Sequence, residues 1–221
     1  MGWLRKFFSS SPDKDMTVEE RISAARSELG CRADEHAALP PEDRRRNLRD
    51  IATIADLHPE LAVDVIGALR MAKDDPVDEV RTGAIISLGF LAERHDAVRK
   101  DILLALGHIG TASYSVARDH AINQAARISV LRPDYTDTAV RVIRTVGFGT
   151  MADEGNRMKA LNLMGNILAR PSGQRPALIA ETLPHFVSAS TDRHDDVRKL
   201  ADEWIGRLNA LKTPKPPDPA P

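Results

Sequence analysis

Residues 75–89 read DPVDEVRTGAIISLG, and this stretch contains a pattern that recurs along the 221-residue chain. Arg81 is followed by apolar residues three, seven and ten positions later. The same spacing follows four other arginines, and the intervals between the five are 36, 37, 39 and 41 residues. Apolar positions at this spacing lie on one side of an α-helix, and a period near 40 residues is typical of helical repeat proteins. The five arginines are Arg45, Arg81, Arg118, Arg157 and Arg198.

Each repeat is predicted to contain two helices, the second of which starts near the arginine and buries the apolar stripe. No segment shows the sustained alternation that a sheet requires, so the predicted fold is all-α. Pro184 lies inside one predicted helix and predicts a kink there. The first helices are predicted at Val18–Leu29, Leu61–Met71, Val98–Ile109, Ala139–Val146 and Leu178–Val187. The stripes are Leu48/Ala52/Ala55, Ala84/Leu88/Leu91, Ala121/Ala125/Ile128, Ala160/Met164/Ile167 and Ala201/Ile205/Leu208.

The position eight residues after each arginine is occupied by a small side chain in four of the five repeats. A small residue there lets neighbouring helices approach closely, which outweighs the cost of ~1 kcal/mol that a glycine imposes on a helix. The residues are Gly89, Ala126, Gly165 and Gly206, with Thr53 in the first repeat.

The stretch 75–89 resembles a HEAT repeat. In that family an Asp closes the turn, Val-Arg-x-x-Ala enters the second helix, and Leu-Gly often follows. Residues 195–201 show the same outline, the segments around Arg118 and Arg157 show it less clearly, and Leu48 replaces the Ala after Arg45. The resemblance covers roughly residues 17–211. It implies a right-handed α-solenoid of about five HEAT-like helix pairs, whose second helices line a concave face.

Two tails flank the predicted repeat domain of residues 17–211. Residues 1–16 form a predicted flexible tail, whose basic and aromatic tip WLRKFF either contacts an anionic membrane surface or a partner, or is simply frayed. Residues 212–221 are rich in proline and are predicted to be a disordered tail. No apolar run reaches the ~18 residues that a membrane-spanning helix needs.

Composition narrows the functional classes. Charged residues make up 29% and nearly balance, with a net charge of −1, which disfavours a dedicated nucleic-acid binder. Aromatic residues make up 4%, too few for a platform on which bases stack. The single cysteine, Cys31, excludes an internal disulfide and a multi-cysteine metal site, and it is consistent with a cytoplasmic location.

No pattern typical of catalysis, metal binding or cofactor binding was found. None of the seven histidines stands three or four residues from another, the spacing expected of two ligands on one helix. HEAT-like deoxyhypusine hydroxylases bind iron with His-Glu dipeptides, and this chain has none. There is neither a Walker loop nor a GxGxxG motif. We therefore predict no catalytic residue, no metal and no cofactor.

The five arginines themselves are predicted to form a structural ladder. Each lies near the edge of the packed face, where a guanidinium can bridge the acidic residues of the turns. A ladder that binds phosphate groups is the alternative. The acidic candidates are Asp75, Asp78, Asp153 and Asp195.

The outward row of the second helices, at positions +1, +5 and +9 after each arginine, is the candidate binding surface. Apolar anchors beside amide and guanidinium groups suit recognition of a protein or peptide. The alternative is that Ile86 and Phe90 pack against the next repeat. Arg44, Arg45, Arg46 and Arg49 form a basic cluster that is either a solvated helix face or an anchor for an acidic partner. The candidate binding residues are Ile86, Phe90, Asn123, Arg127, Met158, Asn162, Asn166 and Arg207.

Three functions fit these observations. The first is a non-enzymatic scaffold that binds a protein partner through the concave face. The second is a nucleic-acid-binding protein similar to the alkylpurine DNA glycosylases that are built from HEAT-like repeats. The third is a chaperone-like or lyase-like protein that acts on a pigment or cofactor protein.

Overall fold

The computed structural model describes residues 17–170 and 176–212, and ten α-helices account for most of them. Within these ranges no residue lies in a strand, as predicted. The predicted tails, apart from the end of the last helix, fall outside the described residues. The helices are α2 (Val18–Glu35), α3 (Pro41–Leu57), α4 (Ala62–Arg70), α5 (Asp78–Arg94), α6 (Arg99–Thr111), α7 (Ser115–Leu131), α8 (Thr136–Gly147), α9 (Glu154–Ala169), α10 (Pro176–Ala189) and α11 (Asp195–Lys212).

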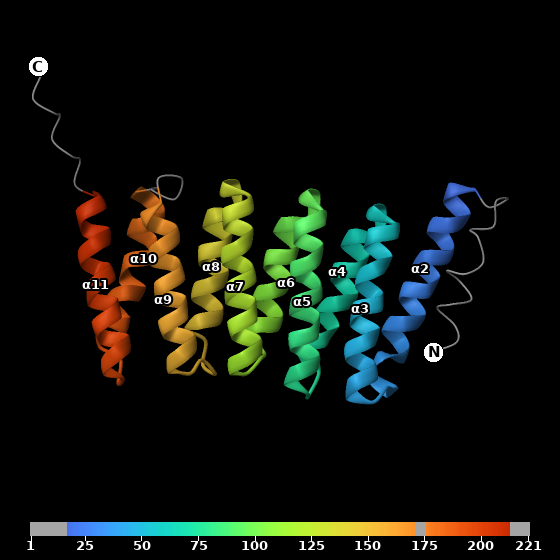
Figure 1. Cartoon of the computed structure of the whole chain (residues 1–221), viewed down its shortest axis with the longest axis horizontal. Helices are drawn as coiled ribbons and strands as arrows, with labels where there is room; N and C mark the ends of the chain where they lie inside the picture. Colours follow the sequence, from blue (N-terminus) through green and yellow to red (C-terminus); the bar gives the residue numbers. More distant parts are fainter. Residues whose placement is uncertain (1–16, 171–175, 213–221) are drawn as a thin grey trace, which may run out of the picture.

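The helices pack as neighbouring pairs in a two-layered row (Figure 1). Helices α3, α5, α7, α9 and α11 form one layer, in which each helix contacts the next. The preceding helix of each pair lies in the second layer, where α4 contacts α6 and α6 contacts α8. Both helices of each predicted pair are present, and α10 continues through Pro184.

One continuous hydrophobic core runs between the two layers, from Ala25 in α2 to Leu208 in α11. The predicted apolar stripes supply much of it. Every stripe residue is buried except Ile205, which is half-buried in the last helix and packs against the core. The second layer contributes matching residues, such as Leu61 and Val65 from the α4 region and Ile102 from α6, all fully buried.

Four of the five predicted ladder arginines make one recurring contact. Each guanidinium donates to the backbone carbonyl of a residue five or six positions earlier, in the turn before its own helix, and so closes that turn. The contacts are Arg81 to Asp75, Arg118 to Ser113 at 2.6 Å, Arg157 to Ala152 at 2.8 Å and Arg198 to Asp192 at 2.8 Å.

In the first repeat Arg44 makes this contact and Arg45 does not. Arg44 Nη1 donates to the carbonyl of Leu39 at 2.8 Å, and its Nε donates to Asp75 at 2.7 Å. The first repeat therefore begins one residue earlier than the sequence pattern predicted. With Arg44 as the origin, the small residue at +8 is Ala52, and Ile54 leaves the outward row. Ile54 is indeed buried, because it packs into the core of the first pair.

Two of the glycines at position +8, Gly89 and Gly165, lie where neighbouring helices approach closely. A Cβ added to Gly89 would collide with the side chain of Gln124 in α7, and one added to Gly165 would collide with the indole of Trp204 in α11. Gly206 occupies the same position in the last repeat, and no atom lies within 4 Å of a Cβ added there. A glycine is therefore sterically required at Gly165 but not at Gly206.

This difference predicts opposite effects of the same substitution. Gly206→Ala should raise the free energy of unfolding by about 0.5–1 kcal/mol, because alanine favours the helix and nothing obstructs its methyl group. Gly165→Ala should lower it by about 1–3 kcal/mol, because the methyl group must displace Trp204. Urea unfolding followed by circular dichroism measures both. Stabilisation by both alanines would show that the helices do not depend on close approach at this position.

Candidate functional site

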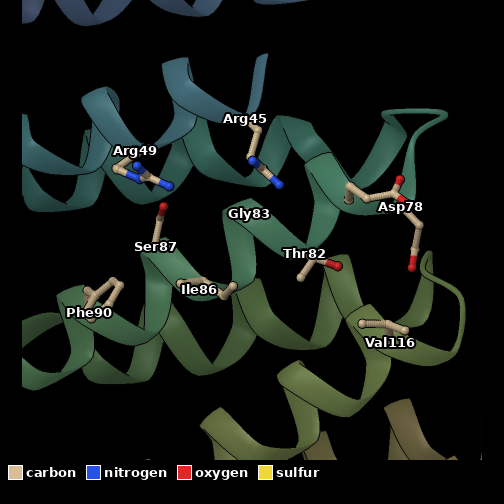
Figure 2. Close-up of a pocket in the computed structure, with 10 residues that line it drawn as sticks. Arg45, Arg49, Asp78, Thr82, Gly83, Ile86, Ser87, Phe90 and Val116 are labelled. Atoms are coloured by element: carbon tan, nitrogen blue, oxygen red, sulfur yellow. The ribbon is translucent and has the colours of Figure 1, made fainter. Parts of the chain in front are cut away.

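A pocket of about 660 Å³ opens on the layer formed by α3, α5 and α7 (Figure 2). It lies in the outward row predicted as the binding surface, near the amino-terminal end of the helix row. Helix α5 contributes most of the lining, and α3 and α7 form the two sides. The lining residues are Arg45, Arg49, Asp78, Glu79, Thr82, Gly83, Ile86, Ser87, Phe90 and Val116.

Two arginines of α3 form the basic side of the pocket. Arg45 and Arg49 stand four residues apart, so their side chains lie on the same face of the helix. Both are exposed, and neither makes an ion pair or a side-chain hydrogen bond with any residue that the structure describes. In contrast, Arg44 pairs with Asp75 and Arg46 pairs with Asp43 at 3.0 Å.

The Arg45 side chain extends across Gly83 of α5. A Cβ at Gly83 would lie 2.8 Å from Arg45 Cγ, closer than carbon atoms normally approach. The glycine therefore leaves the space in which the arginine reaches the pocket. Figure 2 shows the Arg45 guanidinium between α3 and α5, with Arg49 one turn further along α3.

Apolar side chains form the floor and far side of the pocket. Phe90 is 54% exposed and Val116 of α7 is 61% exposed, while Ile86 is half-buried between them. Ile86 and Phe90 stand one helical turn apart on α5 (Figure 2). Exposed apolar side chains grouped in a hollow and bordered by charges are typical of surfaces that bind other molecules.

Two carboxylates stand at the amino-terminal end of α5. Asp78 accepts a hydrogen bond from Arg81 Nη2 at 2.9 Å and another from the backbone N–H of Tyr114 at 3.0 Å. Glu79 is exposed and has no ion-pair partner among the described residues. The pocket is therefore basic along α3 and acidic at the start of α5.

Of the eight candidate binding residues, only Ile86 and Phe90 line this pocket. The other six lie along α7, α9 and α11, and most already have partners. Arg127 pairs with Glu93 at 2.6 Å, Arg207 pairs with Glu203 at 2.5 Å and lies over the Trp204 ring, and Asn166 donates to Asn162 at 3.1 Å. Met158 is half-buried against the core, and Asn123 is exposed.

The sequence interpretation did not place Arg45 and Arg49 in the candidate site. The sequence pattern predicts Arg45 as a ladder residue. Both arginines belong to the basic cluster, which is interpreted either as a solvated helix face or as an anchor for an acidic partner. In the corrected register of the first repeat, they occupy positions +1 and +5, in line with Thr82 and Ile86 of the next. A shift of one residue in the register of the first repeat therefore makes Arg44 the structural arginine and places Arg45 on the surface.

A buried polar cluster beside the first turns of α3 fixes the orientation of this helix. Arg44 forms a bidentate pair with Asp75, and His36 Nε2 lies 3.6 Å from the same carboxylate. Burial lowers the pKa of His36, although the negative charge of Asp75 opposes this, so the imidazole is neutral at pH 7. Because Arg44 points inward to this cluster, Arg45 and Arg49 are left on the outward face.

Other kinds of site find little support in the described ranges. Residues 17–170 and 176–212 contain no group of three or more His, Cys, Asp and Glu side chains that could hold a metal ion. None of their helices is long and apolar enough to cross a membrane. Comparison with protein-family models and with curated proteins gave no match for this chain.

The exposure of Phe90 predicts a small effect on stability. Phe90→Ala should lower the free energy of unfolding by less than about 1 kcal/mol, because the residue is already 54% exposed to solvent. Phe186→Ala is the matched control: that ring is fully buried in α10, and its loss should cost about 3–5 kcal/mol. Equal losses in urea unfolding would mean that Phe90 belongs to the core.

Proposed function

We propose that this protein is a non-enzymatic scaffold that binds a protein partner through the outward face of α3, α5 and α7. The observation that carries the proposal is the pocket of about 660 Å³ in which exposed Phe90 and half-buried Ile86 lie beside two arginines that pair with no described residue. A residue such as Phe90 gains most from burial by a partner, and arginines next to it supply orientation.

The proposal includes a HEAT-like α-solenoid with this face as its concave side. The recurring arginine contact and the repeated helix pairs support it, because such arrays stack one supersecondary unit on the next. Several ion pairs also join equivalent positions of consecutive repeats, about one repeat apart in sequence. These pairs include Arg26–Asp64, Arg132–Asp96, Arg141–Glu181 and Arg157–Asp192.

The chemistry of the lining favours recognition over catalysis. No histidine lines the pocket, and Asp78 is already bonded to Arg81 and Tyr114. The one unpaired carboxylate of the lining, Glu79, makes no hydrogen bond with the hydroxyl groups of Thr82 and Ser87, and no lysine or cysteine lines the pocket. What remains is a set of apolar, guanidinium and carboxylate groups suited to binding.

Binding of nucleic acid is supported less well. Phosphates need a continuous row of cations, whereas the net charge is −1 and Arg127 and Arg207 of the same face are paired with glutamates. A phosphate chain along the pocket would also approach Asp78 and Glu79. We therefore propose a protein partner and keep nucleic acid as an outcome of the test.

The test is affinity capture from a native lysate with the whole chain, with and without nuclease, followed by mass spectrometry. Wild type and Phe90→Ala are compared with Leu104→Ala, which removes an apolar side chain that is 46% exposed on α6 in the other layer. We expect a stoichiometric partner that survives nuclease, persists with Leu104→Ala and is lost with Phe90→Ala. A partner lost on nuclease treatment, or retained by all three proteins, would contradict the proposed site.

A further inference from the structure

Neither of the two pocket arginines forms an ion pair with a described residue, and three of the four acids of α3 pair elsewhere. The fourth, Glu42, is exposed and also pairs with no described residue. Asp43 pairs with Arg46, Asp50 pairs with Arg32 at 3.3 Å, and Asp56 pairs with Arg94. Each of these carboxylates is thus held away from the pocket. Within the described residues, no acid lies close enough to Arg45 or Arg49 to form a salt bridge.

The spacing of the arginines suits a single carboxylate. Side chains four residues apart on a helix have Cβ atoms about 5–6 Å apart, so two flexible arginines can converge on one group between them. A guanidinium binds a carboxylate through two parallel hydrogen bonds, which fixes its orientation. The basic side of the pocket is therefore complementary to an acidic side chain.

The apolar floor lies directly opposite this basic side. Figure 2 shows Arg49 across from Ser87 and Phe90, and Arg45 across from Gly83 and Thr82. From Thr82 to Phe90 the lining of α5 extends over about 12 Å, the rise of eight helical residues. A ligand that fills it covers about four extended residues or two turns of helix.

We propose that the pocket binds an acidic and apolar segment of a partner protein. An Asp or Glu carboxylate of that segment lies between Arg45 and Arg49, and a nearby Leu, Ile, Met or Phe side chain packs on Ile86 and Phe90. Glu79, at the other end of the pocket, favours a basic residue further along the segment. This inference rests on the proposed protein-binding function and names the chemistry of its partner.

The test uses the immobilised whole chain to select from a display library of random peptides of about twelve residues, longer than the pocket. Four proteins are compared: wild type, Arg45→Glu/Arg49→Glu, Phe90→Ala and Arg70→Glu/Lys100→Glu. The last makes the same charge change at exposed positions of α4 and α6, outside the pocket lining, and is the control.

Wild type and the control should enrich peptides with Asp or Glu within four positions of a large apolar residue. Arg45→Glu/Arg49→Glu should lose this preference and select Lys or Arg in its place. Phe90→Ala should keep the acidic preference and lose the apolar one. A synthetic, fluorescein-labelled copy of the strongest peptide should bind Arg45→Glu/Arg49→Glu at least about tenfold more weakly than wild type, because the variant loses the charged hydrogen-bond donors to the peptide carboxylate.

Two results would overturn the inference. The first is that wild type enriches no peptide, or enriches peptides without a preference for Asp or Glu. A preference for acidic peptides that Arg45→Glu/Arg49→Glu shares with wild type would contradict the inference in the same way. The other is tight binding of a fluorescein-labelled single-stranded oligonucleotide that depends on Arg45 and Arg49. If the affinity capture still recovers a protein that resists nuclease and depends on Phe90, the proposed function stands and only the further inference fails. If no such protein is captured, the proposed function and the further inference both fail.

Discussion

Arg118→Met is expected to lower the free energy of unfolding by about 3–5 kcal/mol, because Arg118 is completely buried at the centre of the helix row. Its guanidinium donates to the carbonyl of Ser113 at 2.6 Å, to that of Thr111 at 2.7 Å, and to that of Val146. Methionine keeps most of the apolar stem but leaves these acceptors without a donor, and each buried unsatisfied group costs about 1–3 kcal/mol.

The size of this effect follows from what the Arg118 side chain connects. Thr111 is the last residue of α6, Ser113 lies in the turn before α7, and Val146 is near the end of α8. One guanidinium therefore joins the carboxyl-terminal ends of two helices in the second layer to a helix of the first. Burial lowers the pKa of Arg118, while the charges of Asp153 and Asp78 oppose this shift. The group stays charged at neutral pH, since an arginine starts from a very high pKa.

Arg127→Met is the matched control for Arg118→Met. Arg127 lies on the same helix, but its side chain is 56% exposed and its one ion pair, to Glu93, lies at the surface. Its replacement should change the free energy of unfolding by no more than about 0.5–1 kcal/mol. Urea unfolding of both variants, followed by circular dichroism, gives the comparison. A small loss for Arg118→Met would show that the three carbonyls find other donors.

The sequence pattern predicted the helices and the core because both depend on short-range periodicity. The stripes of Arg81 and Arg118, for example, are buried residue for residue. The contacts of individual side chains were less predictable. The sequence pattern predicts Arg127 as a binding residue but does not indicate its ion pair with Glu93, a residue of the preceding repeat. A single sequence does not indicate which charged side chains of consecutive repeats form ion pairs with each other.

The one-residue error in the first repeat has a specific physical cause. The buried face of α3 is wide. Leu48, Ala52 and Ala55 stand three, seven and ten residues after Arg45, Asn47, Ile51 and Ile54 stand at the same spacing after Arg44, and all six are buried. Three consecutive arginines give no further means of choosing between origins. The register is set by Asp75 of the next repeat, which pairs with Arg44, the only one of the three arginines that points inward.

The resulting assignment predicts that two adjacent arginines behave oppositely. Arg44→Met should lower the free energy of unfolding by about 3–5 kcal/mol, because it leaves the buried Asp75 carboxylate without its bidentate partner. Arg45→Met should change it by less than about 0.5 kcal/mol, because Arg45 is exposed and makes no ion pair with a described residue. Peptide binding, measured by fluorescence polarisation, should be weakened more by Arg45→Met than by Arg44→Met. Equal losses of stability in Arg44→Met and Arg45→Met would contradict the corrected register and support the one predicted from the sequence, in which Arg45 is the ladder residue.

The pH dependence of Arg44→Met gives a second, independent test of the buried cluster. In the wild type, burial lowers the pKa of His36; the Asp75 charge raises it and the Arg44 charge lowers it further. Removing Arg44 leaves His36, whose Nε2 lies 3.6 Å from the Asp75 carboxylate, as the remaining ion-pair partner of Asp75 among the described residues. The His36 pKa therefore rises in the variant, and a raised histidine pKa contributes stability at low pH that is lost as pH increases. Destabilisation by Arg44→Met should thus be smaller at about pH 5.5 than at about pH 7.5. The difference should disappear in Arg44→Met/His36→Gln, and its persistence there would assign the pH dependence to another group.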